Sequence, residues 1–490
     1  MAKQEIKYYN LPDKYWHRIH FVRPRFKSNI ENVLLYMAGE CCRIPDCSCE
    51  DYNKKYLNAI RMFPGNIDMA EKTLHNWRTE IPALFGFYVE DKEADITRTS
   101  KMATFLYENQ DLTQFFRLFL MSFQFPGGHM KPQDLKDIIY LNIRFKPAKT
   151  IIQVLLAGNE LLSSENSVKE MSLSAEEATY CIFNDVRVTS GQIAKTILDN
   201  RKNQIKYYNP ADPHTKSLTG ASRTKGDMTR YAGDILDYME LADLLTKNGS
   251  YFYLKGNELQ AIQAFAKDKT WFKGYESFYG QNDLDTASLS AVEPNWFAYV
   301  NDSMKPDMFK TDIRSLLQQD DEIDIVFGER IQDVVSGDRT TKDIGNLGEA
   351  IICGHEKMRL KINGYGEQFI KLVQIVDSPS YHPGFDIDSF EGDGTEDHRY
   401  IEVKTTVSKQ KIQMYGFHMS PNEWRVANTI KEHYCVYRLM LSAHSKVLIV
   451  LRNPVALYKT DKIEAMPRDG MEVSFDSNMF EPTEILAWKR

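Results

Sequence analysis

This chain is organised around GFDI at residues 384–387 and YIEVKTT at residues 400–406, which are separated by an interval rich in Gly, Asp and Glu. In a β-strand, residues i and i+2 point to the same face, so Glu402 and Lys404 would project side by side. The Gly and Asp residues of the interval are turn formers, and they would let the chain fold back and bring Asp386 beside Glu402. The sequence therefore predicts a β-hairpin that carries two carboxylates and one ammonium group.

Two carboxylates and an ammonium group at the edge of a sheet suit the hydrolysis of a phosphodiester. Mg²⁺ takes oxygen ligands and is usually held by one or two carboxylates together with waters and phosphate oxygens. Such a metal lowers the pKa of a bound water and neutralises charge in the transition state. We therefore expect Asp386 and Glu402 to hold Mg²⁺, and Lys404 to position the attacking water. The alternative is a structural hairpin whose charges are solvated.

The pattern of Asp386, fifteen intervening residues, Glu402, one residue and Lys404 resembles the PD-(D/E)xK nuclease signature, with Gly-Phe-Asp in place of the usual Pro-Asp. Over residues 340–455, this pattern and its neighbours resemble the NO VEIN C-terminal domain, a nuclease-like module. The resemblance implies that Glu349 lies near the metal site. The ordered motifs are GNLGE at 345–349, GFDI at 384–387, IEVKTT at 401–406, SPNEW at 420–424 and YCVYR at 434–438.

The SPNEW motif also has a structural explanation. Ser420 is placed to cap a helix that begins at Pro421, with Glu423 at the third helical position, which is the pattern of a capping box. We expect capping to be the role of this motif. Contact of Asn422 and Glu423 with DNA is the alternative.

Composition limits the class of protein. The 490 residues suit two to four domains, and hydrophobic residues make up 42%. The formal net charge is −7, so any surface that binds nucleic acid must be local. No apolar run is long enough to span a bilayer and the N-terminus lacks the apolar segment of a signal peptide, so we expect a cytoplasmic protein without a membrane partner.

Four of the seven cysteines crowd into one short stretch. Thiolates at such spacing could hold a structural Zn²⁺, although the usual C-x-x-C pair is absent. Reduced thiols in a loop and an adjacent helix are the expected alternative. The four residues are Cys41, Cys42, Cys47 and Cys49.

Basic and aromatic residues interleave near the N-terminus, over residues 15–27. This pattern suits an arm or first strand that contacts phosphates, and basic decoration of a strand explains it equally well. The candidate contacts in this stretch are Arg23, Arg25 and Lys27.

Residues 185–260 are typical of a DNA reader. Two predicted helices, at about 191–200 and 227–239, precede the sequence LLTKNGSYFYL at 244–254, in which Asn-Gly between β-forming residues indicates a hairpin. Helix, helix and hairpin is the winged-helix order. Between residues 187 and 231 there are nine Lys or Arg and three Asp, a local net charge of +6. The alternative is a basic, solvated loop. The candidate DNA contacts are Arg201, Lys202, Arg223, Thr224, Lys225, Arg230 and Lys247.

The N-terminal half resembles the AlwI-type restriction endonucleases. Such enzymes carry a basic-aromatic opening, a helical core with a turn like FQFP, an L-x-x-E-E segment and a winged helix before the nuclease. The matching stretches lie at 16–27, 123–126, 173–177 and 231–254.

These observations predict an α+β or α/β multidomain protein with a mostly helical N-terminal region that includes a winged helix. The C-terminal region would have the PD-(D/E)xK nuclease fold, a mixed sheet flanked by helices. The expected division is a helical DNA-recognition domain at 1–184, a winged-helix domain and connector at 185–335, a linker at 336–343 and the nuclease domain at 344–490.

The predicted activity is that of a sequence-specific, Mg²⁺-dependent double-stranded DNA endonuclease, a type II site-specific deoxyribonuclease of a phage-defence restriction-modification system. The expected partners are double-stranded DNA, a second copy or a second cleaving subunit, and a cognate DNA methyltransferase. One alternative is a nuclease that cuts only methylated DNA, with an aromatic cage near residues 271–279 as its hallmark. The other is a non-catalytic DNA-binding or scaffold protein with a vestigial nuclease fold.

Overall fold

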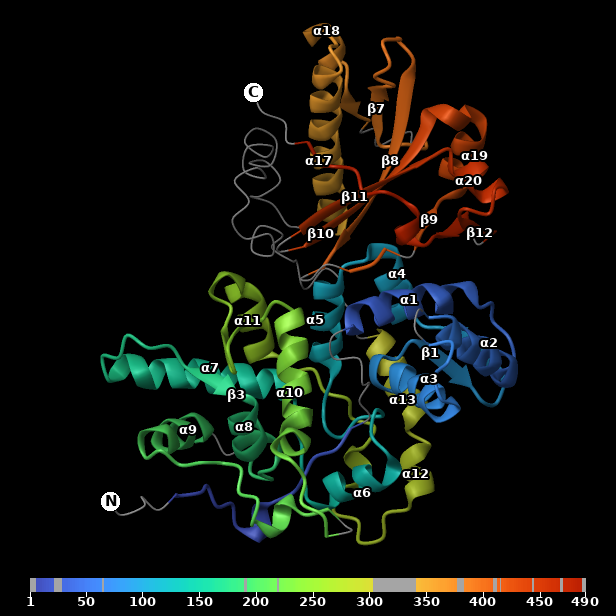
Figure 1. Cartoon of the computed structure of the whole chain (residues 1–490). Coiled ribbons are helices and arrows are strands. Elements are labelled where there is room, and N and C mark those ends of the chain that lie inside the picture. Colours follow the sequence, from blue (N-terminus) through green and yellow to red (C-terminus); the bar gives the residue numbers. More distant parts are fainter. Residues whose placement is uncertain are drawn as a thin grey trace. The chain divides into compact units, whose positions relative to one another are not determined.

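The structure is a computed structural model with a mixed α+β fold (Figure 1). The chain forms two compact units, each built from segments that are separated in the sequence. Unit 1 comprises Met1–Lys27, Ala70–Ser100 and Phe115–Lys305, and unit 2 comprises Ser28–Met69, Lys101–Gln114 and Pro306–Arg490. The residues that the structure describes are 6–21, 29–63, 66–188, 192–217, 220–302, 341–376, 383–408, 412–414, 416–442, 445–467 and 470–486.

The four-part division expected from the sequence is linear, whereas the two units interleave along the chain. That division stays a prediction. Residues 336–340 of the expected linker lie outside the described residues, and Thr341 begins a helix.

Unit 1 is mainly helical, with two small sheets. Aromatic residues dominate its core: Phe85 packs against Phe115, Phe116 and Phe119 with ring centroids 4.9–6.4 Å apart. Such rings bury large apolar areas. The helices are α3 (Glu71–Phe85), α5 (Leu112–Ser122, which begins in unit 2), α6 (Pro132–Tyr140), α7 (Pro147–Ser164), α8 (Ala175–Ala178), α9 (Ile193–Lys202), α10 (Lys225–Leu241), α11 (Leu259–Lys267), α12 (Thr286–Ser290) and α13 (Glu293–Asp302). The strands are β1 (Tyr88–Asp91), β2 (Ile96–Thr99), β3 (Ser172–Ser174), β4 (Leu245–Asn248) and β5 (Tyr251–Leu254).

The order helix, helix, hairpin that the sequence predicts is present in α9, α10, β4 and β5. A two-residue loop at Gly249 and Ser250 joins β4 to β5, and Gly249 has a φ of 58°, a backbone conformation that glycine adopts at no steric cost. Strand β3 pairs with β5 and completes a three-stranded sheet. A capping box begins α8: the Ser174 hydroxyl accepts a hydrogen bond from the amide of Glu177, and the Ser174 amide donates to the Glu177 carboxylate.

Unit 2 contains a five-stranded mixed sheet in the order β11-β10-β8-β7-β6. Strands β8 and β10 run parallel, and the other neighbouring pairs are antiparallel. A second sheet has the order β12-β13-β9. The strands are β6 (Gln374–Ile375), β7 (Ile387–Phe390), β8 (His398–Val407), β9 (Gly416–Met419), β10 (Tyr434–Ser442), β11 (Ser445–Arg452), β12 (Glu464–Pro467) and β13 (Met471–Ser474). The helices are α1 (Ile30–Arg43), α2 (Cys49–Met62), α4 (Lys101–Asn109), α17 (Thr341–Ile362), α18 (Glu367–Ile370), α19 (Pro421–Ile430) and α20 (Pro454–Lys459).

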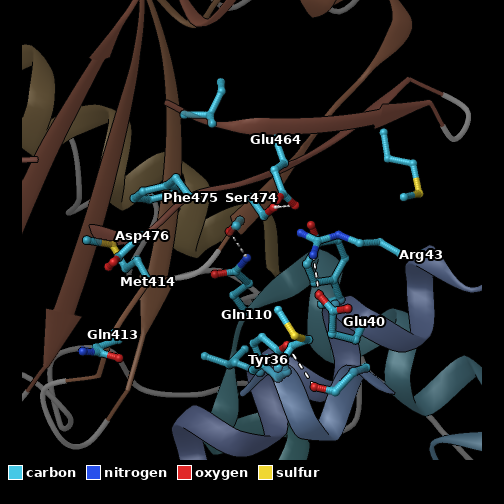
Figure 2. Close-up of a pocket in the computed structure, with 18 of the residues that line it drawn as sticks. Tyr36, Glu40, Arg43, Gln110, Gln413, Met414, Glu464, Ser474, Phe475 and Asp476 are labelled. Carbon is cyan, nitrogen blue, oxygen red and sulfur yellow. Dashed lines mark hydrogen bonds and ion pairs between the residues drawn. The ribbon is translucent and has the colours of Figure 1, made fainter. Parts of the chain in front are cut away.

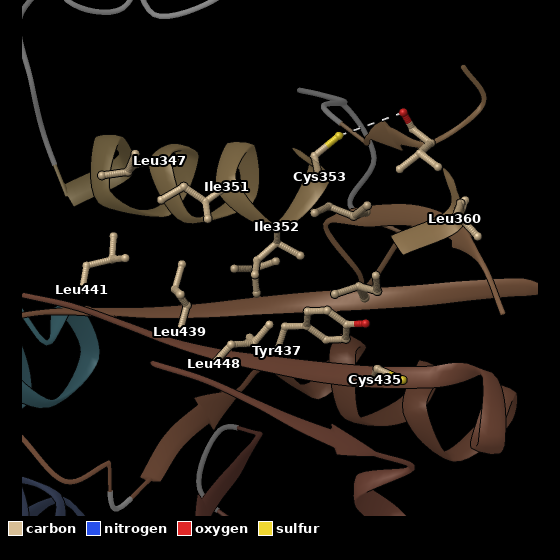
Figure 3. Packing of buried hydrophobic residues seen from close by; sticks show 14 of the residues in the cluster. Leu347, Ile351, Ile352, Cys353, Leu360, Cys435, Tyr437, Leu439, Leu441 and Leu448 are labelled. Atoms are coloured by element: carbon tan, nitrogen blue, oxygen red, sulfur yellow. Dashed lines mark hydrogen bonds between the residues drawn. The ribbon is translucent and has the colours of Figure 1, made fainter. Parts of the chain in front are cut away.

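The long helix α17 covers one face of the five-stranded sheet (Figure 3). Leu347, Ile351 and Ile352 of the helix pack toward the apolar side chains of β8 and β10, and all three are buried. Leu439 and Leu441 supply the facing side chains of β10. This apolar layer fixes the strand that carries the predicted catalytic residues.

One buried carboxylate also ties α17 to the sheet. Glu356 accepts hydrogen bonds from Arg359 on its own helix, from the Ser389 hydroxyl at 2.7 Å and from the Tyr437 phenol at 2.8 Å. Because the carboxylate is fully buried, these donors replace the water that it loses on folding.

The apolar run at residues 446–451 predicts a buried central strand, and this expectation is wrong. It forms β11, the last strand in the order of the sheet. Strand β10, whose nine residues are all buried, occupies the interior position instead. The run is apolar at β11 because the chain covers part of this edge, with a bridge between Leu448 and Thr483. Among the described residues, no helix is long and apolar enough to cross a membrane.

Candidate functional site

The structure brings Asp386, Glu402 and Lys404 together. Asp386 lies just before β7; its amide donates to the carbonyl of Ile401 at 2.8 Å, and its Oδ2 accepts from the amide of Val403 at 2.7 Å. These two contacts place the Asp386 carboxylate beside Glu402, which lies between them on β8. The Nζ of Lys404 lies 2.7 Å from Oε1 of Glu402.

Glu402 is almost completely buried, with 3% of the residue exposed. Its Oε1 contacts Lys404, but its Oε2 makes no hydrogen bond within the part of the chain that the structure describes. Burial raises the pKa of Glu402 well above its usual range; the positive charge of Lys404 opposes this rise, and the Asp386 carboxylate adds to it. An ionised carboxylate oxygen that is buried without a donor is costly. A cation would supply the missing partner, so Oε2 fits a metal ligand.

A second carboxylate reaches the same lysine from another element. Oε2 of Glu423, on α19, lies 2.9 Å from Nζ of Lys404. Glu423 also completes the predicted capping box with Ser420, which confirms the structural explanation of the SPNEW motif. The sequence indicates the cap because that pattern is local, but it contains no signal for the contact with Lys404.

Lys404 therefore lies between two acidic groups, with 22% of its side chain exposed. Burial alone would lower the pKa of Lys404, but the carboxylates of Glu402 and Glu423 raise it above its ordinary value. The two carboxylates therefore favour the ammonium form of Lys404, which donates to Oε1 of Glu402 and to Oε2 of Glu423.

Glu349 lies on α17, where that helix meets β8. The neighbouring Gly348 allows the close approach, because a Cβ at this position would lie 1.8 Å from Oγ1 of Thr405. Thr405 follows Lys404 directly, so Glu349 is carried by the part of the helix that touches the candidate catalytic strand. Its side chain is half-buried.

A buried arginine fixes the backbone of that strand. Arg438, on β10, is 1% exposed and donates to the carbonyl of Lys404 at 2.7 Å and to Oγ1 of Thr406 at 2.6 Å. It also donates to Oε1 of Gln110, whose own amide donates to the carbonyl of Gly416 at 3.0 Å. Burial lowers the pKa of Arg438 to about 10.

A cavity of about 860 Å³ lies elsewhere in unit 2 (Figure 2). Helices α1 and α2 and the strands of the second sheet line it, and Glu40, Arg43 and Glu464 contribute charged side chains. Thr406 is the residue of β8 that reaches it. Asp386, Glu402 and Lys404 do not line this cavity, so the candidate catalytic groups lie outside it.

The four clustered cysteines separate into two environments. Cys41 and Cys42 lie in the buried face of α1, whereas Cys47 and Cys49 are half-buried at the start of α2. Burial raises the pKa of Cys41 well above its usual value, which disfavours the thiolate that zinc requires. In the described part of the chain, no group of three or more His, Cys, Asp or Glu side chains is arranged to hold a metal ion. A Mg²⁺ site with two carboxylates needs fewer such groups.

The predicted DNA-contacting residues of unit 1 fall into different situations. Arg201 is held by Glu177, with N–O distances of 2.6 and 2.7 Å, so it supports the capping box of α8. Lys225 pairs with Glu176 at 2.5 Å, Lys247 pairs with Asp237 at 3.0 Å, and Lys202 is exposed at the end of α9. Arg23, Arg25 and Lys27 lie outside the described residues.

Three arginines gather at the N-terminus of α10. Arg18 is 7% exposed and donates to the main-chain oxygen of Asp227, while its Nε makes no hydrogen bond within the described part of the chain. Burial, then the nearby charges of Arg223 and Arg230, lower the pKa of Arg18 to about 10. Thr224 caps the helix with Asp227. A concentration of positive charge at a helix N-terminus suits a phosphate.

Arg18 is not among the DNA contacts that the sequence predicts, although the basic-aromatic stretch at 15–27 contains it. The basic-aromatic pattern suits a stretch that binds phosphate, but it does not distinguish one of its cations from another. Which of its cations would face the N-terminus of α10 depends on contacts between Arg18 and residues about 200 positions away, such as Asp227.

The aromatic residues at 271–279 pack against other groups. Phe272 and Tyr275 are buried, with ring centroids 5.6 Å apart. The Trp271 indole donates to Glu276 at 2.9 Å, and the guanidinium of Arg144 lies 3.5 Å from the ring centre of Tyr279. These contacts give the aromatic residues a structural role in unit 1.

Two regions of the chain match known protein families. Residues 9–297, more than half of the chain, match the N-terminal region of restriction endonuclease BpuJI. The chain belongs to this restriction endonuclease family. The match confirms the restriction endonuclease resemblance of the N-terminal half and identifies the family as that of BpuJI. Residues 348–451 match the C-terminal region of protein NO VEIN, as the five motifs predict.

A solved structure supports the fold of the BpuJI-like region. It is the BpuJ1 endonuclease binding domain in complex with pyrene- and phenanthrene-modified DNA. The similarity covers 60% of this chain and 100% of that one, with a TM-score of 0.50 and 23% sequence identity. At this identity the likeness concerns the fold. No curated protein matches the chain.

Proposed function

We propose that this protein is a sequence-specific, Mg²⁺-dependent double-stranded DNA endonuclease of the type II restriction kind. The observation that carries the proposal is the convergence of Asp386, Glu402 and Lys404, in which Oε2 of Glu402 is buried without a hydrogen-bond donor among the described residues. The family of the N-terminal region and the DNA complex of the solved relative support DNA as the substrate.

The residues of the site would divide the work as follows. Asp386 and Glu402 would hold Mg²⁺, which, when bound, lowers the pKa of a water and neutralises charge on the phosphate. Lys404 would orient the attacking water or a phosphate oxygen, since its Nζ lies beside the proposed metal ligand, 2.7 Å from Oε1 of Glu402. Glu349 would support the site from α17.

The fold proposed for residues 344–490 is that of a PD-(D/E)xK nuclease, on the basis of the mixed sheet and of the hairpin-like pairing of β7 with β8. The fold proposed within residues 185–335 is a winged helix, on the basis of α9, α10 and the β4–β5 hairpin. Residues 1–184 would complete the recognition region.

DNA binding is proposed to use the arginine cluster at the start of α10. Arg18, Arg223 and Arg230 would contact the phosphate backbone, together with Lys202 and with Arg23, Arg25 and Lys27 of the N-terminal stretch. One active site cuts one strand, so a double-strand break requires a second copy or another cleaving subunit. A cognate methyltransferase would protect the host DNA.

The experiment that tests the function is digestion of unmethylated phage and plasmid DNA by the purified full chain with Mg²⁺, beside the variant Lys404→Ala. Discrete fragments from the wild type and far slower cleavage by the variant are expected, and sequencing of the fragment ends would give the recognition site. Cleavage restricted to methylated DNA would replace the proposal with the modification-dependent nuclease. Tight, salt-dependent DNA binding without cleavage of either substrate would indicate the non-catalytic binding protein.

A further inference from the structure

Lys404 has two carboxylate partners that come from different elements. Glu402 precedes it by two residues on β8, whereas Glu423 lies at the start of α19. The N–O distances are 2.7 Å to Glu402 and 2.9 Å to Glu423, so both contacts are within hydrogen-bond range. The ammonium group therefore contacts carboxylates on two different elements.

The two carboxylates differ in what else they can bind. Glu402 has a buried oxygen without a hydrogen-bond donor among the described residues, which fits a metal ligand. Glu423 uses its Oε2 for Lys404 and for the amide of Ser420 at 3.2 Å, and its own amide donates to Oγ of Ser420 at 3.3 Å. The Ser420 amide thus holds the same carboxylate oxygen of Glu423 that contacts Lys404, whereas the Ser420 hydroxyl contacts only the Glu423 backbone.

A dication at Asp386 and Glu402 would change the balance around Lys404. It would draw the negative charge of Glu402 toward itself and would repel the nearby ammonium group. If Glu402 were its only carboxylate partner, Lys404 would be held more weakly once the metal is bound, which is the state in which cleavage occurs. Glu423 offers a second carboxylate partner, which belongs to α19 rather than to β8 and is 7% exposed.

We propose that Glu423 is a positioning residue for DNA cleavage: it holds the Lys404 ammonium group in place once Glu402 is engaged by the metal. This role rests on the proposed function. It goes beyond the helix cap, because a cap requires only a hydrogen-bond acceptor, whereas holding an ammonium group against a dication requires negative charge.

The two roles of Glu423 can be separated by a pair of variants. Glu423→Gln keeps an acceptor at the third helical position, where Gln also completes a capping box, but it removes the charge. Ser420→Ala removes the hydroxyl half of the cap, yet residue 420 still has the amide that donates to Glu423, so the contact with Lys404 is kept. The first variant tests positioning and the second tests capping.

The measurement is the single-turnover cleavage rate at saturating DNA and Mg²⁺, with DNA affinity measured separately in Ca²⁺ and thermal stability measured for each protein. We expect Glu423→Gln to lower the rate by roughly tenfold or more, a loss within the range of proton-transfer and positioning effects, with DNA affinity and Tm close to those of the wild type. Ser420→Ala should lower Tm by a few degrees and leave the rate within about twofold of the wild type.

A double variant shows whether Glu423 acts through Lys404. If it does, Lys404→Ala combined with Glu423→Gln should be no slower than Lys404→Ala alone. An additive loss in the double variant, or a wild-type rate in Glu423→Gln, would overturn the positioning role while the nuclease activity stands. A wild-type protein that cuts no DNA would overturn the proposed function and this role with it.

Discussion

His129 in unit 1 should make the protein lose stability as the pH falls below neutral. Its side chain is completely buried, and its ring lies 4.3–6.2 Å, centre to centre, from those of Phe21, Phe123, Phe125 and Trp296. Neither ring nitrogen makes a hydrogen bond within the described part of the chain. Burial lowers the pKa of His129 from 6.5 to about 3.

The sign of the effect follows from which state binds the proton first. The folded-state pKa lies below the unfolded-state pKa, so an unfolded chain takes up a proton near pH 6.5 that the folded chain refuses. Protonation therefore favours unfolding, and the loss of stability grows from about pH 6.5 down to about pH 3. At about 1.4 kcal/mol for each pH unit within this window, the change from pH 7 to pH 5 should cost about 2 kcal/mol.

The assay is urea unfolding of the wild type and of His129→Met at pH 7 and at pH 5, followed by tryptophan fluorescence. Trp296 reports the local transition, since its ring centroid lies 5.7 Å from that of His129. Methionine is of similar size, adapts to irregular cores and does not titrate. The variant should lose about 2 kcal/mol less than the wild type between the two pH values. Carboxylates that titrate in both proteins contribute equally and cancel in this comparison. Equal pH dependence in the two proteins would refute the reasoning, because it would mean that folded His129 accepts a proton as readily as the unfolded chain does.

Three further predictions concern Arg438, Arg18 and the strand β8 that carries the candidate catalytic residues. Arg438→Met and Gln110→Ala should each destabilise unit 2 by about 2–4 kcal/mol, because each leaves buried hydrogen-bond partners unsatisfied. A double-mutant cycle in urea should show a coupling energy of about 1–3 kcal/mol. Additive losses would contradict the hydrogen bonding between Arg438 and Gln110. Arg18→Ala should weaken binding of all DNA sequences and reduce the slope of log K against log salt by about 1, whereas an unchanged slope would exclude a phosphate contact. Gly348→Ala should lower the free energy of unfolding by about 1–3 kcal/mol through overpacking. It should also slow cleavage, because the new Cβ would displace Thr405, the residue next to Lys404. Adding Thr405→Ala should restore part of the stability and of the rate, and no recovery would mean that the clash lies elsewhere.

The sequence predicts the hairpin that carries the candidate catalytic residues because its signals are local. Alternation along residues 400–406 places Glu402 and Lys404 on one face, and the structure pairs β7 with β8 as the turn-forming interval indicates. The capping boxes at Ser174 and Ser420 follow from residues three positions apart, and both are formed. Such patterns need no knowledge of the tertiary fold.

The position of a strand in its sheet is not a local property. The run at 446–451 is apolar enough for an interior strand, yet it forms the end of the sheet as β11. Its neighbour β10 is buried along its whole length because α17 covers one face and other elements of unit 2 cover the other. Composition alone does not distinguish an edge that the chain covers from an interior strand.

The same limit applies to the predicted DNA contacts. Counting Lys and Arg between residues 187 and 231 finds the basic region, but Arg201 and Lys225 are occupied by Glu177 and Glu176. Arg18 lies outside the counted region and joins the cluster only through tertiary contacts. Whether a cation can bind a phosphate depends on which acid already pairs with it, and that acid is usually distant in the sequence.

The candidate active site depends both on local sequence patterns and on tertiary contacts. Asp386, Glu402 and Lys404 come from patterns that can be read along the chain, and these groups would define the chemistry. The groups that hold them come from elsewhere: Arg438 fixes the Lys404 carbonyl from β10, and Glu423 holds the ammonium group from α19. Since a displacement of about 1 Å can cost two orders of magnitude in rate, these supporting contacts should determine whether the predicted catalytic residues act.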